Sequence, residues 1–179
     1  MNTKTSKRII FIASIILISI LASACRNKNT ENKEEKVNRK IEQKIVFVQQ
    51  FTNYSDTYTN RGYFIDNEGN KVTYDLSSED KKYADIKELL AYLEKLQYDK
   101  SESKISQEDL LKYYDLLYKI DPNYKLDEKS YGADKGSNAL YGIVYDSNKS
   151  PKIVLIDETG DWVKKNTDSN AIKIKEGLR

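Results

Sequence analysis

The first apolar stretch of the chain runs from Ile9 to Leu21, with Ser14 and Ser19 as its two polar positions. Three cationic side chains and no carboxylate precede it. From Ile9 to Cys25 there are 17 residues, fewer than the roughly 20 that a helix needs to cross the hydrocarbon core of a bilayer. A positive region before a short apolar one is typical of a secretory signal peptide, so we expect residues 1–24 to be removed.

The apolar pattern stops after the cysteine. Val37 and Ile41 are the only apolar residues in 26–44, too few to bury, so we expect residues 25–44 to form a flexible tether. The pattern resumes abruptly with Ile45-Val46-Phe47-Val48, a β-branched and aromatic cluster typical of a buried strand. Residues 45–179 are long enough for one globular domain with its own core.

Alternating and β-branched segments occur in two groups, one on either side of the middle of the chain. They predict strands at 45–48, 57–65, 71–76, 139–145, 152–157 and 162–163. Gly69 in the connection Asp66-Asn67-Glu68-Gly69-Asn70 can adopt the positive φ of a tight hairpin turn. Segments 65–72 and 156–163 both read Ile-Asp-x-x-Gly-x-x-Val, which predicts two hairpins of the same turn type.

Leucines and tyrosines recur at helical spacing between the two groups of strands. The first helix follows Ser77-Ser78-Glu79-Asp80, which resembles a capping box, and is predicted to end near Gln97. The second opens at Ser106 and ends before Pro122, and a short last helix follows Asp168. The order of strands, two central helices, strands and a C-terminal helix predicts an α+β fold with an antiparallel sheet.

Residue usage excludes several chemistries. The chain has no histidine and one cysteine, Cys25. If Cys25 is acylated, no thiol remains for disulfides or for a cysteine nucleophile, and histidine-dependent triads and zinc sites are excluded. Carboxylate, serine-lysine and tyrosine chemistry remain, together with oxygen-ligated cations. We expect no catalytic residue, no metal and no cofactor, and lean against an enzyme.

The charge balance is close to neutral once the signal is set aside. Three of the 30 basic residues and none of the 28 acidic residues lie in residues 1–24, so the remaining side chains carry a formal charge of −1. A nucleic-acid-binding protein would show a clustered basic face, so we do not expect a nucleic-acid partner.

The apolar stretch ends on Leu21-Ala22-Ser23-Ala24-Cys25. Small residues before a single cysteine resemble the lipobox of bacterial lipoproteins. The leucine stands one place further from the cysteine than in the commonest form of that motif. The resemblance implies diacylglycerol on the Cys25 sulfur, cleavage before it, and attachment to the outer face of the cytoplasmic membrane. An ordinary signal peptide cut near Ala24, and an uncleaved anchor, are the alternatives.

Tyrosine is the conspicuous side chain of the domain, with 14 copies, all after residue 50. Aromatic faces suit sugars and protein partners. Tyrosines in the helical stripes are expected in the core, whereas Tyr54, Tyr58, Tyr131 and Tyr141 lie outside them and are the candidate ligand-binding residues.

Three other polar groups are possible sites. The acidic turns at 66–70 and 157–161 contain possible calcium ligands but lack the spacing of a 12-residue calcium loop, so a turn role is favoured. Ser137 with Lys135 could form a serine-lysine pair, but their glycine-rich segment, 131–138, reads better as a connecting loop and lacks phosphate-loop spacing.

The lipobox, segment 61–70 (RGYFIDNEGN), segment 154–162 (VLIDETGDW) and Asn166-Thr167-Asp168 together resemble a family of small lipoproteins of Gram-positive bacteria that has no assigned activity. The resemblance covers most of residues 45–178 and supplies no catalytic residues.

These features predict a membrane-anchored extracytoplasmic lipoprotein. Its domain is expected to bind a protein, peptide or cell-wall ligand without catalysing a reaction. A carboxylate-dependent hydrolase acting on envelope material and an immunity-type lipoprotein are the alternatives. Neither the ligand nor the oligomeric state follows from the sequence.

Overall fold

The computed structural model describes residues 40–55, 57–79, 82–83, 85–98, 103–132 and 135–178. The chain divides between Asn38 and Arg39 into two units, and the described residues belong to the second. Cys25, the predicted signal peptide and most of the predicted tether therefore lie outside the described residues.

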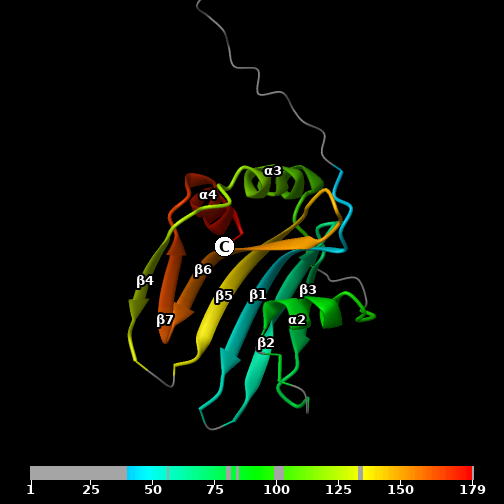
Figure 1. Cartoon of the computed structure of the whole chain (residues 1–179). Coiled ribbons are helices and arrows are strands. Elements are labelled where there is room, and N and C mark those ends of the chain that lie inside the picture. The colour runs from blue at the N-terminus through cyan, green and yellow to red at the C-terminus, as the bar shows by residue number, and fades with distance from the viewer. Residues whose placement is uncertain are drawn as a thin grey trace, which may run out of the picture. The chain divides into compact units, whose positions relative to one another are not determined.

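Within the described residues, seven strands form one sheet in which all neighbouring strands are antiparallel (Figure 1). Their order across the sheet is β3-β2-β1-β5-β6-β7-β4, so strands from the two halves of the domain meet where β1 pairs with β5. In chain order the strands are β1 (Ile45–Asn53), β2 (Thr59–Asp66), β3 (Lys71–Asp75), β4 (Leu126–Ser130), β5 (Ser137–Tyr145), β6 (Pro151–Gly160) and β7 (Trp162–Asn166).

The strand β1, which has a neighbour on each side, supplies apolar side chains to both faces of the sheet. Successive residues of a strand point to opposite faces. Phe47 and Val48 are both fully buried, Phe47 in one hydrophobic cluster and Val48 in the other. Helices therefore cover both faces of the sheet, and each face has its own core.

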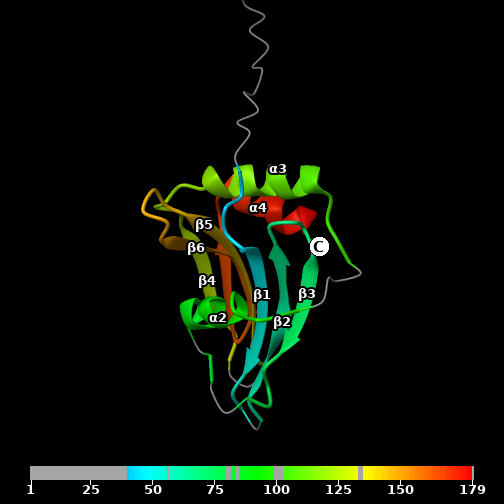
Figure 2. The same ribbon diagram turned by 90° about the vertical axis from the view of Figure 1, so that its right-hand side faces the viewer.

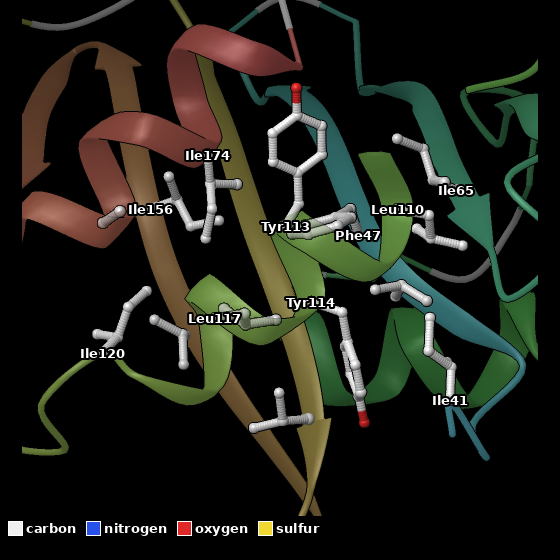
Figure 3. Close-up of a cluster of buried hydrophobic side chains, with 14 residues drawn as sticks. Ile41, Phe47, Ile65, Leu110, Tyr113, Tyr114, Leu117, Ile120, Ile156 and Ile174 are labelled. Atoms are coloured by element: carbon white, nitrogen blue, oxygen red, sulfur yellow. The ribbon is translucent and has the colours of Figure 1, made fainter. Parts of the chain in front are cut away.

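One face is covered by α3 (Gln107–Tyr118) and α4 (Ser169–Gly177), which lie together at the same end of the sheet (Figure 2). Leu110, Tyr114 and Leu117 of α3 pack with Phe47 and Ile174 in the first cluster (Figure 3). Both helices begin where the sequence predicts, because a side-chain oxygen at each start accepts a free backbone N–H. The Ser106 hydroxyl accepts from Asp109 N at 3.0 Å, and the Asp168 carboxylate accepts from Asn170 N at 2.7 Å.

The opposite face is covered by α2 (Ile86–Leu93), whose Leu89, Leu90 and Leu93 pack in the second cluster with Phe64 and Ile143. In Figures 1 and 2, α2 lies below α3 and α4.

The predicted start of α2 at the capping-box sequence is wrong. Asp85 caps the helix instead, accepting from Lys87 N at 2.8 Å. The Ser77 hydroxyl accepts from Asn60 N at 3.1 Å, because Ser77 lies two residues beyond the end of β3 and extends the contact with β2. Asp80 lies outside the described residues, and α2 ends at Leu93 rather than near Gln97.

The hairpin between β2 and β3 has the predicted turn. Gly69 adopts φ +87°, and the Asp66 carboxylate accepts from Glu68 N at 2.9 Å and from Asn70 N at 2.8 Å. The amide of Asn70 donates to the second Asp66 oxygen at 2.8 Å. Burial of the Asp66 side chain therefore serves the turn.

The second Ile-Asp-x-x-Gly-x-x-Val segment does not form the same turn, so that prediction is wrong. Asp157 remains within β6, opposite Lys165 of β7, and binds Lys175 of α4. The turn itself lies at Gly160 and Asp161, where Asp161 N donates to Gly136 O at 2.9 Å. The two segments therefore share the pattern Ile-Asp-x-x-Gly-x-x-Val, but their backbones turn at different positions.

The prediction of an α+β fold with an antiparallel sheet is confirmed, and the sheet makes up more of the domain than the sequence suggested. One strand, β4, was not predicted; its five residues are LDEKS, and all but Leu126 are exposed. Of the described residues, no helix is long and apolar enough to cross a membrane.

Candidate functional site

A hollow in the sheet lies on the face that carries α3 and α4, beyond the part that these helices cover. We call it the sheet hollow. It has a volume of about 500 Å³ and is lined by Gln49, Phe51, Arg61, Gly62, Tyr63, Thr73, Tyr74, Asp75 and Asn138. These residues belong to β1, β2, β3 and β5, four adjacent strands.

An outer row of side chains crosses these four strands. Phe51 pairs with Arg61 on one side and with Asn138 on the other, and Arg61 pairs with Asp75. From β5 to β3, the row therefore consists of the amide of Asn138, the ring of Phe51, the guanidinium of Arg61 and the carboxylate of Asp75. Directly opposed residues in a sheet have Cβ atoms about 4.5–5.5 Å apart, so neighbouring members of the row can contact one ligand.

An inner row runs beside it, nearer to the helices. Gln49 pairs with Tyr63, and Tyr63 pairs with Thr73. The next side chains along β1 and β2 on this face are Phe47 and Ile65, which belong to the cluster under α3 and α4. Tyr63 packs against this cluster, so the inner row borders the core and the outer row lies farther from it.

The outer row is fixed by electrostatic contacts. The Arg61 guanidinium carbon lies 5.6 Å from the centre of the Phe51 ring, a cation-π contact. Hydrogen bonds from the Ser77 hydroxyl and from its backbone N–H, together with the nearby Arg61 charge, lower the pKa of Asp75 below its ordinary value. The N–H bond to Asp75 Oδ1 is 2.9 Å long. Asp75 is therefore a carboxylate at neutral pH.

A side-chain hydrogen bond and a cation-π contact position the inner row. The Gln49 side-chain amide donates to Asn138 Oδ1, which links the two rows. Lys71 Nζ lies 3.9 Å from the centre of the Tyr63 ring. Burial raises the pKa of Tyr63, so its hydroxyl is protonated at neutral pH and available as a hydrogen-bond donor.

The floor of the hollow depends on a glycine. A Cβ atom at Gly62 would lie 2.0 Å from the carbonyl oxygen of Gln49. Tyr74, opposite Gly62 on β3, donates its hydroxyl to that same oxygen at 3.2 Å. Burial, with smaller contributions from the charges of Tyr141 and Tyr58, raises the pKa of Tyr74 strongly.

The four tyrosines proposed from the sequence do not line the sheet hollow. Tyr54 is 52% exposed just beyond β1, and its ring centre lies 5.3 Å from that of Tyr58. The Tyr58 hydroxyl accepts from Tyr83 N and Asn60 Nδ2, so it ties the segment before α2 to β2. Tyr131 is 58% exposed just beyond β4.

Tyr141 is partly buried within β5. Burial, followed by the charges of Glu158 and Asp85, raises its pKa to about 12. The structure thus brings Tyr54 and Tyr58 into contact, and it leaves Tyr131 in a loop and Tyr141 within the sheet.

Ser137 binds a different partner from the lysine considered in the sequence. Its hydroxyl donates to Glu158 Oε1 at 2.6 Å, and Lys164 Nζ contacts Glu158 Oε2 at 2.9 Å. The three residues lie on adjacent strands, so they join β5, β6 and β7. The backbone N of Lys135 donates to Asp161 Oδ1 at 2.8 Å, which orders the loop before β5.

Metal ligands are not gathered in the described part of the domain. No group of three or more Asp, Glu, His or Cys side chains there could hold a metal ion. The acidic turn at Asp66 uses its oxygens on the turn N–H groups and on Asn70, as described above.

The residues of the sheet hollow were not identified from the sequence. The sequence does contain one relevant signal, which is a spacing of two residues between polar or aromatic side chains in three strands. Residues at this spacing share a face of the sheet. The pairs are Gln49 and Phe51, Arg61 and Tyr63, and Thr73 and Asp75. Their meeting depends on the register of β1 with β2 and β5, which the sequence does not state. No family model matches the chain, and no curated protein or solved structure shows significant similarity to it.

Proposed function

We propose that this chain is a lipoprotein anchored through Cys25 at the outer face of the cytoplasmic membrane, and that its domain binds an envelope ligand in the sheet hollow. On this proposal it is one of the small Gram-positive lipoproteins that its sequence resembles, and its function is binding rather than catalysis. The anchor rests on Leu21-Ala22-Ser23-Ala24-Cys25 behind a basic and then apolar leader.

The binding role is carried by the position and lining of the sheet hollow. Phe51 lies six residues after Ile45, so the outer row is about 20 Å along β1 from the point where the chain enters the sheet. The described residues 40–44, which lead into β1, therefore lie at the opposite end of that strand. Its lining combines three aromatic side chains with five polar or charged ones, so it offers both apolar contact and hydrogen bonds to a ligand.

The lining supports binding over hydrolysis. Among the described residues of the hollow, Asp75 is the only carboxylate. A glycosidase needs two carboxyl groups, about 5–9.5 Å apart, with one of them protonated as the acid. The pKa of Asp75 is lowered, which is opposite to the raised pKa that a general acid requires.

The anchor is tested by metabolic labelling with an alkyne analogue of palmitate in a Gram-positive host. We expect the wild-type chain to incorporate the label and to sediment with membranes. Cys25→Ser, which keeps the leader and removes the acyl acceptor, should be unlabelled. A wild-type chain without label, or a Cys25→Ser chain that still carries it, would show that Cys25 is not the lipid site.

Binding in the hollow is tested by placing a photoreactive p-benzoylphenylalanine at Thr73, an exposed lining residue, and irradiating intact cells. A matched probe at Glu128, exposed on β4 outside the hollow, measures non-specific capture. We expect an adduct at Thr73 that is missing at Glu128. Equal adducts at both positions, or none at either, would contradict binding in the hollow.

A further inference from the structure

The polar groups of the sheet hollow alternate between hydrogen-bond donors and acceptors. Because Gln49 donates to Asn138 Oδ1, the Asn138 amide remains as a donor and Gln49 Oε1 remains as an acceptor. Arg61 offers N–H donors beside the acceptor-only carboxylate of Asp75. A ligand group that both donates and accepts matches this array, and a hydroxyl group does both.

The charges of the outer row restrict the ligand further. Arg61 and Asp75 are opposed on adjacent strands, so together they contribute no net charge. An anionic ligand that approached Arg61 would meet Asp75, and a cationic ligand that approached Asp75 would meet Arg61. The lining therefore favours a neutral ligand that carries several hydroxyl groups.

The lining also includes aromatic side chains. Phe51 and Tyr63 stand diagonally on β1 and β2, one in each row, and present carbon surface between the polar groups. A sugar ring has hydroxyl groups around its edge and C–H groups on its faces, so it needs both kinds of contact at once. A volume of about 500 Å³ falls within the usual range of small-molecule sites and accommodates a short oligosaccharide.

We infer that the sheet hollow binds a neutral saccharide, with Phe51 and Tyr63 against the C–H surface of a sugar ring and Arg61, Asp75 and Asn138 on its hydroxyl groups. The inference rests on the proposed binding role of the hollow and names its ligand class. The ligand is a segment of a neutral glycan rather than a charged polymer or a peptide.

The test is calorimetric titration of the full chain in detergent micelles with neutral tetrasaccharides of glucose, mannose and N-acetylglucosamine. Tetraglutamate and tetralysine are the charged comparison ligands. We expect at least one tetrasaccharide to bind and neither peptide to bind.

Phe51→Ala should weaken saccharide binding about tenfold or more, because the ligand loses an aromatic contact. The matched control Tyr131→Ala, an exposed tyrosine outside the hollow, should bind as the wild type does.

A second variant covers the case in which Phe51→Ala fails to fold. Asp75→Asn retains the Oδ1 that accepts from Ser77 N, and the side chain is exposed, so the fold should be kept. It removes the charge that opposes Arg61, and we expect it to bind tetraglutamate measurably when the wild type does not. Failure of Asp75→Asn to gain that binding would overturn the role assigned to the charge pair.

Two other results would overturn the saccharide inference: no binding of any tetrasaccharide up to about 10 mM, or a preference of the wild type for either charged peptide. A Thr73 adduct that contains only protein would also overturn it while leaving the proposed binding role intact. Loss of lipid labelling would affect the anchor alone, because the calorimetric assay does not depend on acylation.

Discussion

At the scale of single residues, Gly62 shows how closely β1 and β2 approach each other in the floor of the sheet hollow. A Cβ atom there would lie 2.0 Å from the backbone oxygen of Gln49, which cannot move without disturbing both strands. We therefore expect Gly62→Ala to lower the free energy of unfolding by about 1–3 kcal/mol. Urea denaturation measures the loss, and Lys129→Ala on the exposed strand β4 should change stability by no more than about 0.5 kcal/mol. Equal stability of Gly62→Ala and wild type would contradict the close approach.

Tyr141 provides a prediction for alkaline pH. Its pKa is raised to about 12 in the folded chain, whereas a tyrosine in an unfolded chain ionises near pH 10. Between these values the unfolded state has released the proton and the folded state still holds it. The unfolding free energy should therefore fall as pH rises from about 10 to 12.

Tyr141→Phe should remove the part of this decrease in unfolding free energy that comes from Tyr141, because phenylalanine does not ionise. The variant should lose less stability between pH 8 and pH 11 than the wild type does, as measured by urea denaturation at both values. The loss should not disappear, because burial and the Asp66 charge also raise the pKa of Tyr98 to about 12. An identical pH dependence in the two proteins would mean that Tyr141 is not protected in the folded state.

The residue scale also shows what sequence reasoning can and cannot find in a site. Of the four tyrosines outside the helical stripes, Tyr54 and Tyr131 are exposed, whereas Tyr58 and Tyr141 are partly buried. The hollow instead joins Phe51, Arg61 and Asn138, whose sequence separation reaches 87 positions. Their contact requires a strand order that places β5, from the second half of the domain, beside β1. Composition and periodicity do not specify that order.

At the scale of elements, α4 is attached to the sheet by one well-defined polar contact. Lys175 Nζ lies 2.6 Å from Asp157 Oδ1 of β6, and the two side chains are 21% and 12% exposed. Lys175→Met keeps the aliphatic stem and leaves the Asp157 carboxylate without this partner. We expect a loss of about 1–3 kcal/mol in unfolding free energy.

The matched control for this contact is the exposed pair of Lys149 with Glu42, at 4.0 Å and with side chains 79% and 63% exposed. Lys149→Met should change stability by no more than about 0.5 kcal/mol, because exposed ion pairs are weak. If both methionine variants had the same small effect, the packing of α4 would not depend on Lys175.

Elements with strong local signals were predictable, and elements defined by their neighbours were not. Ser106 and Asp168 cap helices because each lies directly before an amphipathic segment. Ser77 has the same local signature, but its hydroxyl accepts an N–H from β2 before the chain can begin a helix. The strand β4 carries charges along an edge of the sheet, and such an edge needs no apolar alternation.

At the scale of the whole domain, the two hydrophobic clusters meet in β1. Phe47 and Val48 are consecutive and fully buried, and they belong to opposite faces of the sheet. Neither face can lose its packing without disturbing the strand that both share. We therefore expect one cooperative unfolding transition. Far-UV circular dichroism and the fluorescence of Trp162, the only tryptophan of the chain and a residue of β7, should report the same midpoint.

Phe47→Ala tests this coupling directly. Removing a fully buried phenylalanine typically lowers stability by about 3–5 kcal/mol, a large part of the roughly 5–15 kcal/mol of an ordinary domain. Trp162 lies on β7, three strands from β1 in the sheet, so a local effect would leave its fluorescence transition in place. If the sheet unfolds as one unit, the circular dichroism and fluorescence midpoints shift together by the same amount. Separation of the two midpoints would show instead that the β7 side of the sheet unfolds independently of β1.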